Sequence, residues 1–198
     1  ARDSKLERAL IVTFALAELL VAGGERVGIP GLMNPTASRN VIDKMAQAIL
    51  HDDLTRASLP PSFVPSARSE IVVLSDFWSP IAEIRTMLAG LSASGAHGTL
   101  IQVVDPAEET FPYAGRVEFV EPENGSTITA GRAERWASDY VSRVALHRDQ
   151  IRSETNMLDW LFSTHTTDRS AAELLLFLHG GMMANKGAVN PVKAGQTA

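Results

Sequence analysis

The chain contains no cysteine among its 198 residues. This absence excludes a disulfide framework, a thiolate nucleophile and a cysteine-ligated metal centre, and it favours a reducing compartment, which we expect to be the cytoplasm. Positive charge is also scarce: the formal net charge is −5, so the basic surface of a nucleic-acid-binding protein is missing. The longest apolar run, residues 9–24, is interrupted by Glu18 and is shorter than the ~20 residues that span a bilayer. The sequence therefore predicts neither nucleic-acid binding nor a membrane span.

Familiar catalytic motifs are missing as well. None of the five histidines forms an H-E-x-x-H motif, no serine lies in a G-x-S-x-G elbow, and no glycine-rich loop has phosphate-binding spacing. His147 lies on the apolar face of a predicted helix and is interpreted as a core histidine rather than a metal ligand. The composition is otherwise ordinary, with 45% hydrophobic and 21% charged residues, which indicates a folded globular chain.

Helical and strand patterns alternate along the chain. A capping box at Ser4 and Glu7 predicts a long buried helix that ends at Gly23–Gly24. The continuous apolar, β-branched run at residues 70–76 is typical of a central parallel strand that is covered on both faces. The alternation predicts an α/β fold with a mainly parallel sheet between helices. The other expected elements are strands at 26–32, 98–104 and 158–163, helices at 38–50, 79–91, 132–155 and 170–181, and a β-hairpin at 116–129 around Asn124–Gly125.

These elements predict a single domain over residues 1–181. The proline- and serine-rich segment at residues 55–69 is interpreted as a loop within this domain rather than as a boundary. From Met182 onward the residues are small, polar and aperiodic, which predicts a flexible tail over residues 182–198.

The candidate site lies at the carboxyl ends of the predicted strands, where parallel sheets gather their functional groups. Asp76 follows a buried apolar run, so its carboxylate must be hydrogen-bonded, paired or metal-bound. It either accepts N–H groups of the following turn or binds Mg²⁺ or a similar hard cation through oxygen ligands. Ser75 lies at the same carboxyl edge of the sheet, which we call the rim. Asp105 ends the next strand and either pairs with Asp76 around a metal or in acid–base chemistry, or begins a turn at Asp105–Pro106 that leaves Glu108 and Glu109 solvated.

Three segments resemble a bacterial family catalogued as domain of unknown function fifty-eight, which is related to the von Willebrand factor type A domain. They are IVVLSDF at residues 71–77, V-x-D-P-x-E-x-x-F-P-x-x-G-R-V at residues 103–117, and LDWLFSTHT at residues 158–166. The resemblance spans roughly residues 4–180 and implies a Rossmann-like three-layer sandwich with a metal-ion-dependent adhesion site at its carboxyl edge. It implies that Asp76 is the aspartate of that site and that Thr36 is a candidate for its threonine.

The resemblance breaks down at the start of the chain. The D-x-S-x-S strand end of type A domains has no counterpart before the first helix, because the chain begins ARDSKLERAL. We therefore expect an N-terminally truncated form whose adhesion site is incomplete, with Mg²⁺ or Mn²⁺ bound by a longer protein rather than held tightly here. The missing first strand would lie between residues 26–32 and 70–76, so direct pairing of these two segments would contradict the type A layout.

The resemblance implies a non-enzymatic protein-interaction module that acts with a MoxR-type AAA+ ATPase in chaperone-like assembly or maturation; homo-oligomerisation is left open. The alternative is a metal-dependent hydrolase that uses Asp76 and Asp105 to hold a metal and activate water. A small-molecule or nucleotide binder is a third hypothesis. The missing nucleophile, phosphate loop and histidine ligands count against the second and third hypotheses.

Overall fold

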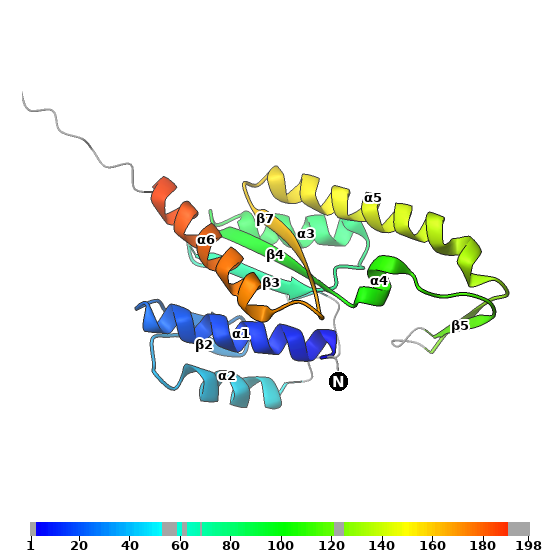
Figure 1. Cartoon of the computed structure of the whole chain (residues 1–198). Coiled ribbons are helices and arrows are strands. Elements are labelled where there is room, and N and C mark those ends of the chain that lie inside the picture. The colour runs from blue at the N-terminus through cyan, green and yellow to red at the C-terminus, as the bar shows by residue number, and fades with distance from the viewer. Residues whose placement is uncertain (1–2, 53–58, 61–62, 68, 121–124, 190–198) are drawn as a thin grey trace, which may run out of the picture.

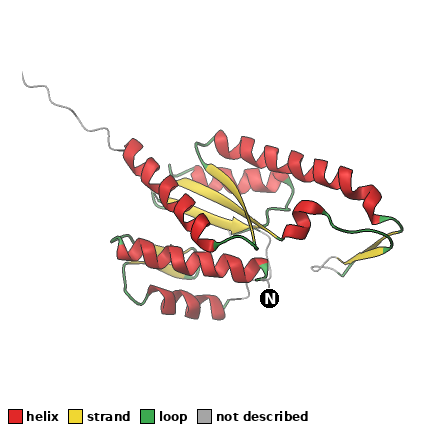
Figure 2. Ribbon diagram, in the orientation of Figure 1, coloured by secondary structure: helices red, strands yellow, loops and turns green. Residues whose placement is uncertain are grey.

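The computed structural model describes residues 3–52, 59–60, 63–67, 69–120 and 125–189. At the centre is a parallel three-stranded sheet of order β3–β4–β7. Helices α1 and α6 cover one face of this sheet, and α3 and α5 cover the other (Figures 1 and 2). The fold is therefore the Rossmann-like α/β sandwich that the sequence predicts. The bounds are β3 Glu70–Ser75, β4 His97–Val104, β7 Leu161–Thr166, α1 Lys5–Ala22, α3 Ile81–Ser92, α5 Ala137–Asn156 and α6 Ala171–Val189.

Two antiparallel hairpins lie outside the central sheet. One packs against α1 and is followed by α2, and the other lies between α4 and α5 in the chain, also as predicted. Among the described residues, no helix is both long enough and apolar enough to cross a membrane. The remaining bounds are β1 Val27–Ile29, β2 Met33–Thr36, α2 Val41–Leu50, α4 Pro106–Thr110, β5 Val117–Val120, β6 Thr127–Ala130 and the short 3₁₀ helix η1 Ala133–Trp136.

Strand β4 is the centre of the core, because its side chains enter both helical layers. Leu100 is fully buried against α3 and α5, whereas Ile101 and Val103 pack on α1 and α6. A strand covered on both faces needs apolar residues at successive positions rather than at alternate ones, which explains the continuous apolar run. Strand β3 has the same pattern but is not central: among the described residues it pairs with β4 alone.

The first predicted strand, residues 26–32, is corrected by the structure. These residues begin a hairpin in which β1 pairs with β2 in an antiparallel sheet of its own. The turn contains Gly31, whose φ of 77° is left-handed and reverses the chain. Residues 33–36, which lie between the predicted strand and the next predicted helix, therefore form a strand of their own. Residues 26–32 and 70–76 are not paired in the described part of the chain, so the pairing that would contradict the type A layout is not observed.

Other boundaries also differ from the prediction, among them those of β7 and α6. Strand β7 begins at Leu161, after a turn in which Asp159 has a left-handed φ of 55°, and it continues to Thr166, beyond the predicted end at residue 163. Helix α6 continues through the predicted stop at Gly180–Gly181 to Val189. Gly181 permits close packing instead of ending the helix, since a Cβ there would lie 2.7 Å from the Leu161 side chain.

Parts of three predicted features fall outside the described residues. These are the loop at 55–69, the turn of the β5–β6 hairpin at 121–124, and the tail from residue 190 onward. The division into a domain over residues 1–181 and a flexible tail stays a prediction, although the first residues of that tail are helical.

Candidate functional site

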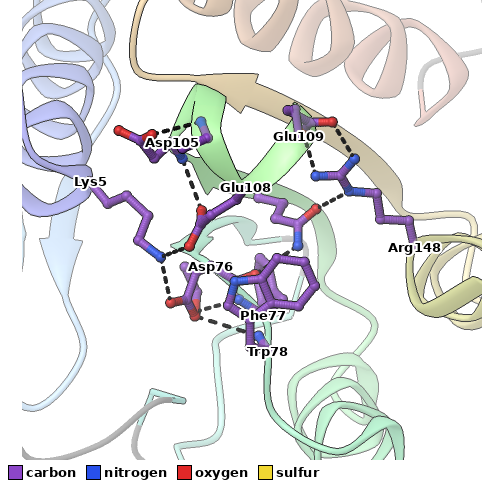
Figure 3. Close-up of polar contacts among 11 residues, drawn as sticks. Lys5, Asp76, Phe77, Trp78, Asp105, Glu108, Glu109 and Arg148 are labelled. Carbon is purple, nitrogen blue, oxygen red and sulfur yellow. Dashed lines mark hydrogen bonds and ion pairs between the residues drawn. The ribbon is translucent and has the colours of Figure 1, made fainter. Parts of the chain in front are cut away.

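Asp76 follows β3 directly at the carboxyl edge of the sheet, where the sequence places it. Its carboxylate makes two kinds of contact (Figure 3). Oδ1 accepts the N–H of Trp78 at 3.5 Å, which is the turn contact considered from the sequence, and Oδ2 lies 3.1 Å from Nζ of Lys5. The side chain is 37% exposed, so Asp76 is a paired carboxylate at the surface rather than a buried charge.

Lys5, the first residue of α1, joins two carboxylates. Its Nζ donates to Oδ2 of Asp76 at 3.1 Å and to Oε1 of Glu108 at 2.8 Å. Burial lowers the pKa of Lys5, but the hydrogen bond to Glu108 and the negative charges of Asp76 and Glu108 outweigh this effect, so the pKa is raised overall. The ammonium form is therefore the form that the folded protein favours.

Asp105 has a different role from the one proposed for a metal or acid–base pair. It is the N-cap of α4: its Oδ1 accepts the N–H of Ala107 at 2.8 Å, and Oε2 of Glu108 accepts the N–H of Asp105 at 2.9 Å. In Figure 3, Glu108 rather than Asp105 extends toward Asp76. Asp105–Pro106 thus begins a short helix, close to the turn of the alternative, but Glu108 is not solvated as that alternative supposes: it is paired with Lys5, which brings it to Asp76.

A second chain of polar contacts lies beneath this rim. Gln102 is fully buried in β4; its Nε2 donates to the Asp76 carbonyl at 2.8 Å, and its Oε1 accepts from Nε of Arg148 at 2.7 Å. Arg148 on α5 also donates to Glu109 through both terminal nitrogens, one of them at 2.8 Å. The backbone at the end of β3 is therefore linked through β4 to α5 and α4.

The turn after Asp76 is strained and firmly held. Phe77 is fully buried with a left-handed φ of 52°, a conformation that costs about 1–3 kcal/mol for a residue other than glycine. Its N–H donates to Oγ of Ser75 at 3.1 Å, and its carbonyl accepts from Nε2 of His147 at 2.7 Å. His147 is thus hydrogen-bonded, as expected, but it is partly buried rather than a core residue. Trp78 follows; it is 36% exposed and stacks on the His147 ring, with centroids 5.8 Å apart.

Thr36 is not part of this cluster. It pairs with Val27 across the β1–β2 hairpin, and Val27 packs on the hydrophobic cluster around Ala17 in the second half of α1. Lys5, which contacts Asp76, is the first residue of the same helix. At 1.5 Å per residue, the helix separates Lys5 from Ala17 by about 18 Å. The structure therefore does not bring Thr36 to Asp76.

The rim does not fit the metal centre that the type A resemblance implies. Asp76 and Glu108 face one common position, but the Lys5 ammonium lies in it, and Asp105 is engaged as a helix cap. Mg²⁺ requires near-octahedral oxygen coordination. In the part of the chain that the structure describes, no group of three or more His, Cys, Asp or Glu side chains could hold a metal ion.

A cleft of about 420 Å³ opens beside Arg148 at the carboxyl end of β7. Asp76 and Asp105, the residues considered for hydrolysis, are not among its lining residues, so the cleft does not present a substrate to them. Most of its lining residues are polar; they are Pro106, Glu109, Thr110, Arg148, Thr164, Thr166, Asp168 and Arg169.

A buried polar cluster connects α1 to the end of β7. Nη2 of Arg8 donates to the Thr167 carbonyl at 2.9 Å and pairs with Asp3 at 2.8 Å. His165 is 4% exposed, and Thr167 is 2% exposed. Burial lowers the pKa of His165, the positive charges of Arg8 and Arg169 lower it further, and the charges of Glu173 and Asp168 oppose them.

This lowered pKa predicts a loss of stability in acid. The folded state binds the His165 proton less readily than the unfolded state, so this group leaves the free energy of unfolding unchanged above pH ~6.5. As the pH falls below this value, the unfolded state gains the proton first, and stability decreases until the lowered pKa is reached. Urea unfolding between pH 7.5 and 5 should show this decrease in the wild type and a smaller one in His165→Gln. His179, which is exposed on α6, supplies the control: His179→Gln should retain the wild-type slope, and equal slopes for all three proteins would contradict the assignment.

The fold and this rim describe an α/β sandwich with an ionic cluster at the carboxyl edge of its sheet. Residues 1–150 match the model of the family described as Protein of unknown function DUF58, so the chain belongs to this family. Searches of the curated proteins and of the solved structures each gave no match.

Proposed function

We propose that this chain is a non-enzymatic protein-interaction module whose binding surface is the carboxyl edge around Asp76 and Trp78. The carrying observation is Trp78 itself, an indole about one-third exposed on a strained turn beside a charged cluster. Tryptophan is enriched among the residues that dominate binding energy at protein interfaces. Contacts from Ser75, Gln102 and His147 hold the turn in place, so a partner would lose little affinity to ordering it.

The alternative, a metal-dependent hydrolase based on Asp76 and Asp105, has less support. The Asp105 carboxylate caps α4, and that of Asp76 is paired with Lys5. Neither residue lines the cleft beside β7. A hydrolase would need both carboxylates free to position a metal and its water, close to a space for substrate.

The finer assignments rest on the type A resemblance. On that basis we propose a MoxR-type AAA+ ATPase as the partner, a chaperone-like role in assembly or maturation, and a cytoplasmic location. The resemblance also predicts Mg²⁺ or Mn²⁺ at a type A adhesion site, but we do not assign such an ion to the residues described. The acidic net charge of −5 supports a protein partner over a nucleic acid.

The Trp78→Ala substitution tests this proposal. We expect it to weaken binding to a purified MoxR-type ATPase from the same cell by roughly 30-fold, because truncating a hot-spot aromatic costs about 2 kcal/mol. Isothermal titration calorimetry measures the change. Trp136, which is 42% exposed and stacks on Phe119 away from the rim, supplies the matched control, and Trp136→Ala should bind as the wild type does.

Two results would contradict the proposal. Equal binding by Trp78→Ala and the wild type would show that the partner does not use the rim. Hydrolysis of a phosphoester panel by the wild type in Mg²⁺ or Mn²⁺, lost in Asp76→Asn, would favour the hydrolase instead.

A further inference from the structure

We infer that the Lys5 ammonium is the resident cation of the rim: it holds Asp76 and Glu108 together in the role that the type A resemblance gives to a divalent metal ion. The inference rests on the proposed function for one point, that this rim is important for binding. The contacts that support it belong to this chain alone.

The geometry is that of a shared counter-ion. The two distances from Lys5 Nζ, 2.8 Å to Glu108 and 3.1 Å to Asp76, are typical of charge-assisted hydrogen bonds. The three side chains are between 26% and 37% exposed, so water screens their charges only in part. Without a positive charge between them, two carboxylates that face one position would repel each other.

Lys5 differs from an ordinary surface lysine in how it is held. It is the first residue of α1, and the capping box of Ser4 and Glu7 fixes this turn of the helix. Arg8, on the same turn, donates to the Thr167 carbonyl at the end of β7. The first turn of α1 is therefore attached to the ends of β3 and β7 and to α4. The position of the ammonium follows from the docking of a helix, which reduces the entropy lost in forming the ion pairs.

A divalent ion would have to displace this ammonium. It would also need several more oxygen ligands, while Asp105 is engaged at the N-terminus of α4. The raised pKa of Lys5 keeps its ammonium charged throughout the neutral range. The rim is thus neutralised by the chain itself, and its shape does not depend on a metal.

Thermal unfolding of the full chain, in EDTA and in millimolar Mg²⁺ or Mn²⁺, tests the inference. We expect one Tm for the wild type in all three solutions, and a Tm lower by roughly 2–4 °C for Lys5→Met, the shift that about 1 kcal/mol produces in a chain of this size. Lys44 is exposed on α2 with no ion pair in the described residues, so Lys44→Met is the control and should melt as the wild type does. In Lys5→Met/Glu108→Gln the repulsion between Asp76 and Glu108 is removed. The decrease in Tm should therefore be smaller than the sum of the decreases in the two single variants.

Two outcomes would overturn the inference. A wild-type Tm that rises in Mg²⁺ or Mn²⁺, with the rise abolished by Asp76→Asn, would make a metal the resident cation. Equal melting of Lys5→Met and Lys44→Met would show that Lys5 does not hold the rim. Neither measurement involves a partner, so these failures are distinct from a failure of the proposed function, which Trp78→Ala reports.

Discussion

Replacing Gly98 with alanine is expected to destabilise the protein by about 3 kcal/mol, near the upper end for adding a methyl group to a packed core. A Cβ at Gly98, near the start of β4, would lie 2.3 Å from the ring of Trp160. The ring has no room to retreat, since Trp160 is 2% exposed and its Nε1 donates to the Ala96 carbonyl at 3.2 Å. Thermal unfolding should therefore show a Tm lower by roughly 6–12 °C.

Gly90 provides the matched control. It lies in the exposed interior of α3, where an added Cβ would meet no described atom within 4 Å. Gly90→Ala should stabilise the protein by about 0.5–1 kcal/mol, because alanine is the better helix former. The double variant Gly98→Ala/Trp160→Phe tests the cause. The double variant should lose less stability than the sum of the losses in the two single variants. Strictly additive losses would mean that the Trp160 ring is not what excludes the methyl group.

The parts of the fold that are predictable from the sequence are those with local determinants. The capping box at Ser4 and Glu7 and the stop at Gly23 place α1 correctly, because each acts within one helical turn. The apolar runs of β3 and β4 predict buried parallel strands, and the hairpin at 116–129 follows from its own turn signal. The β1–β2 hairpin is harder to predict, since Pro30–Gly31 divides a run that resembles one strand and its pairing is a tertiary property.

In the candidate site, too, locally determined features are predictable and those that depend on tertiary packing are not. Asp76 is predictable as a rim carboxylate, because a strand-end acid after an apolar run has few other places to lie. Its pairing with Lys5 is not predictable, because Lys5 is 71 residues away in sequence and reaches Asp76 only through the docking of α1. The sequence does indicate that Gln102 belongs to a polar network, because a buried amide within an apolar strand must form hydrogen bonds. Its partner Arg148, 46 residues away, depends on the placement of α5.

The Arg148→Ala substitution should destabilise the protein by about 2–3 kcal/mol, which urea unfolding measures. The change leaves Oε1 of the fully buried Gln102 without a donor and removes the ion pair of Glu109. Arg143, exposed on the same helix with no ion pair in the described part of the chain, supplies the control, and Arg143→Ala should change stability by less than about 0.5 kcal/mol.

Arg148 should also affect binding at a distance, because it acts on the rim through Gln102, whose Nε2 holds the Asp76 carbonyl. In Arg148→Ala we expect faster hydrogen exchange at residues 76–78 and weaker partner binding, although Arg148 itself need not touch the partner. Arg148→Ala/Gln102→Leu separates the two causes of lost stability. Leucine leaves no buried amide unsatisfied, so the double variant should be less destabilised than the sum of the single changes. Unchanged exchange at 76–78 in Arg148→Ala would mean that the turn holds its shape without α5, leaving Ser75 and the packing of Phe77 to maintain the strained conformation.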